Sequence, residues 1–389
     1  MIAGITLITS GVVLATVVVI ILQSIQKPIV NNNNIVTNRP SSMTTINNEK
    51  NSALQVSTMP KRTIDVVSAM SAFPFVQRWV AQYNNDNRAL AIVQISYLNE
   101  INAAAERDAD IIIEGEPSND HKESLYYIPV STQAVAIVYN IPSFPDVPSG
   151  LRLDANLSSM IFNGTITEWD DKAIKNLNRD LNLPHEKIIV IHEDANGNSS
   201  SLDLLRKYAP RNVIKWPSNG SSMITTGSDD LASMVRKIPY SIGYVDFSYA
   251  IQTKMTFAAM ANAHNDRYII PSIDSISHTV NTAIQIQNIS NASQTTSTTT
   301  LPPLINSSRL LNSSYPIVGL YYAALPSDKL SSNDRNATLD FVKWIIDRNK
   351  GQQALSEVQY PAIYDNRTLM IYTQSIIEKI MHADSNNTK

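Results

Sequence analysis

The sequence is poor in the residue types that several large protein classes require. It has no cysteine, which excludes disulfide scaffolds, thiolate metal sites and cysteine nucleophiles. It has only 11 glycines in 389 residues, and neither of the usual glycine-rich nucleotide-binding loops occurs. Neither sign of charge dominates, because 31 Lys and Arg face 34 Asp and Glu for a net charge of −3. This balance argues against a nucleic-acid partner bound through a basic surface.

The N-terminal segment carries a long uncharged apolar run. Residues 2–26 contain no charged side chain, and Ile5–Leu22 consists mostly of Ile, Val, Leu, Ala and Thr. About 20 apolar residues in a helix span a bilayer. A cleaved signal peptide is the alternative, but it favours a basic start and a shorter apolar run, and no basic residue precedes Lys27. We therefore expect a single-pass transmembrane anchor over residues 1–26.

A polar segment follows, and glycosylation signals are scattered along the rest of the chain. Residues 27–61 are rich in Asn, Ser and Thr, which predicts a disordered linker that holds a folded body away from a membrane. Together with the anchor, N-x-[ST] sequons favour a cell-membrane protein whose body lies outside the cell. The eleven sequons are at Asn156, Asn163, Asn198, Asn219, Asn288, Asn291, Asn306, Asn312, Asn336, Asn366 and Asn386.

The folded body alternates short apolar runs with segments of helical periodicity, which indicates an α/β fold with parallel strands. Strands are expected at 63–67, 90–95, 109–113, 126–139 (in two pieces), 188–191, 242–245 and 316–325. Helices are expected at 73–83, 101–105, 157–162, 172–177, 200–208, 229–237, 337–346 and 369–381. Ser199 or Ser200 is the expected N-cap of the 200–208 helix. Residues 281–314 are rich in Asn, Ser and Thr and predict a loop or disordered insertion.

Several segments carry a family resemblance. They are I-F-N-G-T-I-T-E-W-D-D at 161–171, I-P-Y-S-I-G-Y-V-D at 238–246, V-Y-N-I-P at 138–142 and K-W-P at 215–217. Taken in their order along the chain, they resemble segments of the phosphate-binding protein of the phosphate ABC transporter, the PstS type of periplasmic binding protein. The resemblance covers about residues 64–364, interrupted by the polar insertion.

The resemblance implies a fold and a division into domains. The family has two α/β lobes joined by a hinge, which close over a ligand. Here this implies a two-lobed periplasmic binding protein-like (type II) fold preceded by the transmembrane helix. The implied divisions are lobe 1 at 62–140 and 316–370, lobe 2 at 141–255, a connecting segment at 256–315, and a C-terminal helix and tail at 371–389.

The resemblance also implies a ligand site. The family holds phosphate with hydroxyl groups, with backbone N–H groups at helix N-termini and with one Arg, while a carboxylate accepts the proton of phosphate. Helix N-termini suit this task because their unpaired N–H groups and their dipole favour an anion. The implied ligand-binding residues are Ser71, Phe73, Ser96, His192, Asn196, Gly197, Asn198 and Ser199.

The ligand shell departs from the family at its charged positions. Gly115 stands where the family has the aspartate, with Glu114 and Glu116 on either side. His192 stands where the family has the arginine. A permanently charged bidentate partner is thereby replaced by an imidazole that is mostly neutral at pH 7. The sequence therefore predicts a retained scaffold with altered anion chemistry.

Two functions remain open at this point. The first is a membrane-tethered extracytoplasmic solute-binding protein that binds phosphate or a related small polar anion for ABC permease subunits. The second is a binding-protein-like ectodomain that has lost phosphate binding and acts as a sensor, adhesin or surface interaction module. An enzyme is not expected, since no G-x-S-x-G elbow and no nucleophile–base pair is visible. No cofactor is expected, and no metal site, because the six histidines lack metal-binding spacing.

Overall fold

A computed structural model places most of the body of the chain. It describes residues 62–86, 89–98, 108–115, 125–142, 150–194, 199–210, 214–217, 220–262, 265–291, 313–330 and 332–382. All of them belong to one compact unit, Thr58–Lys389. The expected anchor (1–26), the linker (27–61) and the expected helix at 101–105 lie outside the described residues. Among the helices that are described, none is both long and apolar enough to cross a membrane.

The body is built on an eight-stranded mixed sheet in the order β2-β1-β3-β11-β4-β8-β6-β7. Its outer strands pair in parallel on both sides, β1 with β2 and β3, and β6 with β7 and β8. The central β11 and β4 are antiparallel to each other and to their outer neighbours. The strands are β1 Arg62–Ala69, β2 Ala91–Leu98, β3 Ile111–Glu114, β4 Leu125–Asn140, β6 Ile189–Glu193, β7 Ser222–Thr225, β8 Ser241–Asp246 and β11 Val318–Pro326.

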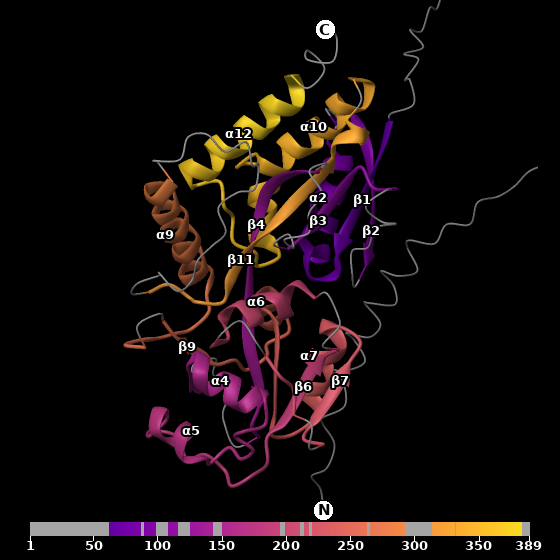
Figure 1. Cartoon of the computed structure of the whole chain (residues 1–389). Helices are drawn as coiled ribbons and strands as arrows, with labels where there is room; N and C mark the ends of the chain where they lie inside the picture. The colour runs from indigo at the N-terminus through magenta and orange to yellow at the C-terminus, as the bar shows by residue number, and fades with distance from the viewer. Residues whose placement is uncertain are drawn as a thin grey trace, which may run out of the picture. The chain divides into compact units, whose positions relative to one another are not determined.

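Strand β4 joins the two halves of this sheet. Its 16 residues are nearly all buried, and a buried strand needs an unbroken apolar run rather than alternation. Residues 125–134 pair with β11, and residues 135–140 pair with β8. Figure 1 shows β4 running from the half with β1, β2 and β3 to the half with β6 and β7. The expectation of two strand pieces at 126–139 was therefore wrong, because one strand with two successive partners covers both.

Helices cover the sheet in the pattern that the apolar periodicity predicts. In α2, the buried residues Phe75, Val76, Trp79, Val80 and Tyr83 recur every three or four positions, and a proline occupies its first turn. The helices are α2 Phe73–Asn84, α4 Ala155–Phe162, α5 Lys172–Leu177, α6 Ser200–Tyr208, α7 Ser228–Lys237, α8 Phe247–Gln252, α9 Ile273–Asn291, α10 Ser332–Ile346, α11 Gly351–Glu357 and α12 Arg367–His382.

The sheet separates two apolar cores. Successive residues of β3 enter different cores, Ile112 into one and Ile111 and Ile113 into the other, because neighbouring side chains of a strand point to opposite faces. One core contains α2 and α10, and the other gathers around β8 and the end of β4. A smaller sheet, β10-β9-β5, consists of Tyr268–Ile269, Ala259–Ala261 and Arg152–Leu153. The expected α/β fold with two halves is confirmed.

One expected loop is in part a helix. The sequence predicted a loop or disordered insertion from residue 281, but α9 continues to Asn291. Ile276 and Val280, which precede this polar stretch in the same helix, are buried in the core and hold the start of the helix, from which it continues to Asn291. Tertiary packing therefore overrides composition here. Most of the remainder of the expected insertion, 292–312, lies outside the described residues.

Candidate functional site

Ser71 lies where the first half of the sheet leads into its first helix. It is in the short 3-10 turn η1, Met70–Ala72, between β1 and α2. The hydroxyl of Tyr360 donates to the Ser71 carbonyl oxygen at 2.7 Å and holds the turn in place. Ser71 thus lies directly before the N-terminus of α2, and its role as a ligand hydroxyl stays a prediction.

Ser200 brings the second half of the sheet to the same point. It is the first residue of α6, and the Ser199 hydroxyl caps this helix by accepting from the Leu202 N–H. The hydroxyls of Ser71 and Ser200 are 3.2 Å apart, although the two residues are separated by 129 positions. The starts of α2 and α6 therefore meet, and each offers unpaired backbone N–H groups.

Gln133 links Ser200 to the long strand β4. Its side chain is fully buried, and its Nε2 donates to the Ser200 hydroxyl at 2.7 Å. Its Oε1 is buried and has no hydrogen-bond partner among the residues that the structure describes. Gly115, at the end of β3, makes this arrangement possible. A Cβ on Gly115 would lie 2.6 Å from the Cβ of Ser200 and 2.8 Å from the Oε1 of Gln133.

An acidic residue is linked to these groups through Tyr321, whose hydroxyl interacts with the side chains of Ser71 and Gln133. Asp246 ends β8 and is almost fully buried; it accepts from the Tyr321 hydroxyl at 3.1 Å and from the Ser248 N–H at 2.9 Å. Burial raises the pKa of Asp246 to about 7, although those hydrogen bonds favour the ionised form. Burial also raises the pKa of Tyr321 well above its ordinary value. We call Ser71, Gln133, Ser200, Tyr321 and Asp246 the polar cluster.

The polar cluster has the chemistry of an anion site without a fixed positive charge. Hydroxyl and amide groups and two helix N-termini can surround an oxyanion and donate to it. Within the described residues, the side-chain hydrogen bonds of Ser71, Gln133 and Ser200 join neutral groups only. Sequence reasoning missed Gln133, Tyr321 and Asp246 as site residues, whereas Ser200 lies in the serine run that it considered for a polar ligand. Only Gly115 gave a signal, because a glycine in place of an acid vacates space for a neighbour.

The remaining predicted ligand residues are Phe73, Ser96, His192, Asn196, Gly197 and Asn198. Phe73 is half-buried at the start of α2, with its ring 4.6 Å from that of Tyr97. Ser96 is exposed on the edge strand β2. Asn196, Gly197 and Asn198 lie outside the described residues. Of the predicted set, the structure brings Ser71 and Ser199 to the meeting point of α2 and α6.

His192 is built into the second half of the sheet. It is buried on β6, its ring stacks on Trp216 with centroids 4.2 Å apart, and its Nδ1 contacts the Glu193 carbonyl oxygen at 2.7 Å. Burial lowers the pKa of His192, which favours the neutral imidazole. His192 therefore brings no positive charge at neutral pH, and its role as a ligand residue stays a prediction.

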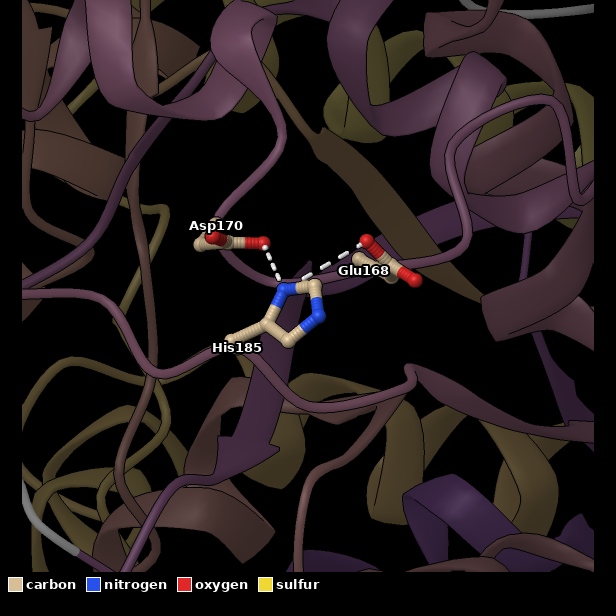
Figure 2. A group of neighbouring side chains, drawn as sticks. All are labelled: Glu168, Asp170 and His185. Carbon is tan, nitrogen blue, oxygen red and sulfur yellow. Dashed lines mark hydrogen bonds and ion pairs between the residues drawn. The ribbon is translucent and has the colours of Figure 1, made fainter.

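A second group of ionisable side chains lies in and shortly after the segment at 161–171, with Glu168 and Asp170 half-buried and His185 exposed (Figure 2). The His185 Nδ1 is 3.1 Å from Asp170 and 3.7 Å from Glu168, and the Lys175 Nζ is 3.0 Å from Asp170. The backbone fixes this group, because the Trp169 N–H donates to the carbonyl of residue 186 and the N–H of residue 188 to that of residue 167.

We call Glu168, Asp170, Lys175 and His185 the charged cluster. The hydrogen bond to Asp170 raises the pKa of His185, and the hydrogen bonds from His185 and Lys175 lower the pKa of Asp170. The ligand atoms of Glu168, Asp170 and His185 lie within 4.8 Å of one another, so these three could hold a divalent cation instead of the proton on His185. Histidine spacing alone gave no signal for this group, since Asp170 and His185 are 15 positions apart.

Two α/β halves joined by β4, with a polar cluster where two helix N-termini meet, are the architecture of two-lobed solute-binding proteins. A family model described as a PBP superfamily domain matches residues 57–349. The chain belongs to this superfamily, and the resemblance stated from the sequence motifs is confirmed at this level.

Similar proteins carry more specific names. The phosphate-binding protein PstS of Xylella fastidiosa (strain Temecula1 / ATCC 700964) is 27% identical over 339 residues, which cover 83% of this chain and 88% of that protein. Among solved structures, a high affinity periplasmic phosphate-binding protein (PfluDING) bound with phosphate matches with a TM-score of 0.54 and 13% identity, over 82% of this chain and 93% of that one. A phosphate binding protein from Stenotrophomonas maltophilia matches with a TM-score of 0.53 and 14% identity over the same shares. At this identity the structural matches establish the fold alone.

Proposed function

We propose that the chain is an extracytoplasmic solute-binding protein that holds phosphate, or a related small tetrahedral oxyanion, at the polar cluster and delivers it to an ABC importer. One observation carries the proposal. Ser71, Gln133 and Ser200 join at the starts of α2 and α6, where backbone N–H groups and the helix dipoles favour an anion. The names of the sequence relatives, phosphate-binding proteins PstS, support the choice of ligand.

The division into lobes gives this site a mechanism. We propose lobe 1 at 62–140 and 316–370 and lobe 2 at 141–255, with 256–315 as the connecting segment. The end of β4, which pairs with β8 of lobe 2, then serves as the hinge. Ser71 belongs to lobe 1 and Ser200 to lobe 2, so opening the hinge separates the two hydroxyls and admits an anion between them. Closure around the ligand would follow the usual behaviour of hinged binding proteins.

The remaining parts of the proposal concern the membrane. The uncharged run at 1–26 is proposed as a single-pass anchor, 27–61 as the tether, 371–389 as a C-terminal helix and tail, and ABC permease subunits as the partners. The body would then work outside the cell, where its sequons are accessible to glycosylation. No catalytic step, cofactor or metal is part of this function.

The alternative is a surface protein that kept the fold and lost the anion. Three observations favour it. His192 is buried and neutral, Gly115 offers no carboxylate, and the hydroxyls of Ser71 and Ser200 already satisfy each other. The body would then serve as a sensor, adhesin or interaction module.

Isothermal titration of the full-length chain with inorganic phosphate distinguishes the two functions. We expect micromolar binding in the wild type. In the double variant S71A/S200A we expect a loss of about tenfold or more, because each hydroxyl contributes a hydrogen bond to a charged ligand. The exposed Ser375 on α12 supplies the control, and S375A should bind as the wild type does. No heat and no thermal shift at millimolar phosphate would overturn phosphate delivery.

A further inference from the structure

The side-chain amide of Gln133 differs from an ordinary buried amide in its hydrogen bonding. The side chain is fully buried, and its Nε2 donates to the Ser200 hydroxyl, but within the described part of the chain no group donates to its Oε1. An unpaired buried carbonyl oxygen costs free energy, so it is a group that a ligand can complete. The Oε1 lies beside Gly115 and next to the first turn of α6, where an anion would be held.

Gly115 decides which group can act as the acceptor here. No carboxylate can project from position 115 without moving Gln133 or Ser200, because its Cβ would come within 2.6–2.8 Å of both. The acceptor in this space is therefore the amide oxygen of Gln133, a neutral group on a different strand. Its neighbours Ser71 and Tyr321 are hydroxyl groups, which can donate or accept according to how they rotate.

An amide differs from a carboxylate in what it can accommodate. A carboxylate only accepts, so it requires a proton on the facing ligand oxygen and repels an oxyanion that carries none. A half-turn of the Gln133 amide exchanges Nε2 with Oε1, and the Ser200 hydroxyl can pair with either atom. When Oε1 faces the ligand, it can accept a hydrogen bond from a protonated ligand oxygen. When Nε2 faces the ligand, it can donate a hydrogen bond to an unprotonated one.

We propose that Gln133 determines specificity at this site, and that its reversible amide makes the site accept tetrahedral oxyanions with or without a proton, phosphate and sulfate alike. This inference rests on the proposed function, because it requires that the polar cluster bind an anion. It goes beyond that function because it assigns a broad class of ligands and names Gln133 as the residue that determines this class.

The test compares inorganic phosphate with sulfate in the full-length chain at pH 8 by isothermal titration. In the wild type, we expect the two dissociation constants to lie within about tenfold of each other, since one reorganised amide hydrogen bond separates them. In Q133E, we expect phosphate to keep most of its affinity and sulfate to lose about 100-fold or more, because an acceptor-only group then faces an unprotonated oxygen. Q133L should weaken both anions without favouring either.

The outcomes separate the two proposals. A wild type that binds phosphate and rejects sulfate by more than 100-fold would overturn the inference and leave the proposed function standing. So would a Q133E variant whose ratio of affinities matches the wild type. Binding of neither anion by a folded wild type would overturn both. Thermal unfolding of each variant, with and without anion, shows whether a lost affinity comes from lost folding.

Discussion

The polar cluster is largely buried and, apart from Asp246, neutral, whereas the charged cluster lies at the surface and combines two carboxylates with Lys175 and His185. The difference follows from solvation. An isolated buried charge is costly, so Asp246 is shifted toward its protonated form. Exposed charges stay solvated, and their pairing contributes little to folding. The polar cluster therefore combines close packing at Gly115, a buried Gln133 oxygen with no partner among the described residues and a raised pKa at Asp246, and changes there should have the larger effects.

The largest effect is expected from filling the space at Gly115. In G115D or G115A, the new Cβ must displace Ser200 and Gln133, and we expect a loss of about 1–3 kcal/mol in the free energy of unfolding. Urea denaturation measures the loss. Combining G115A with S200G removes the nearest contact atom and should recover part of it. Unchanged stability in G115A would contradict the direct contact between the two halves.

The next effect concerns Asp246. Its folded pKa of about 7 lies above its ordinary value of 3.8, so the folded protein binds this proton more tightly than the unfolded chain does. Its contribution to stability is complete below about pH 4 and is lost as the pH rises through about 7. Between pH 5 and 8 the free energy of unfolding should therefore fall by up to a few kcal/mol through this group. We expect D246N to abolish that part of the fall, as measured by urea denaturation. Replacing the exposed Asp328 by Asn is the control, and a slope that D246N leaves unaltered would refute the assignment.

His192 tests whether the polar cluster works without an imidazole. We expect H192A to lose about 1–3 kcal/mol through its stack on Trp216, and H192F to keep most of that stability. Phosphate affinity should change little in H192F, since the native ring is neutral and packed. A tenfold loss of affinity in folded H192F would instead add His192 to the ligand groups.

The smallest effect belongs to the charged cluster. The pKa of His185 is raised in the folded protein, so its stabilising charge is present at low pH and disappears as the pH rises through the folded-state pKa. We expect H185A to lower the melting temperature by less than about 2 °C at pH 5.5 and to leave it unchanged at pH 8. A larger loss at pH 8 than at pH 5.5 would show that packing rather than charge is responsible.

Most of the regular structure was predictable because it is encoded locally. Apolar spacing located α2 and α7 within a residue or two, and the choice of cap at α6 included Ser199, which is the cap observed. The exceptions had tertiary causes. The sequence of β4 does not show that one part of the strand pairs with β11 and the other part with β8. The start of α9 is stabilised by the burial of Ile276 and Val280.

The candidate site was only half predictable. Ser71 and Ser199 follow from family motifs and helix-capping rules, which depend on neighbours in the sequence. Gln133 and Asp246 depend on contacts across 67 and 75 positions, and nothing local distinguishes them from ordinary strand residues. The charged cluster was missed for the same reason. Position 115 was noticed as a departure, but the sequence could not say that another strand fills the vacated space.

The position of β11 has a consequence for the order in which the protein forms during synthesis. Strand β11 lies between β3 and β4 in the sheet, yet it comes near the end of the chain. The strands β6, β7 and β8 can assemble from residues already made, whereas the first half lacks a central strand until residues 318–326 emerge from the ribosome. Until then the inner edges of β3 and β4 have no partner. This interval is when the nascent chain is most exposed to aggregation and most dependent on chaperones.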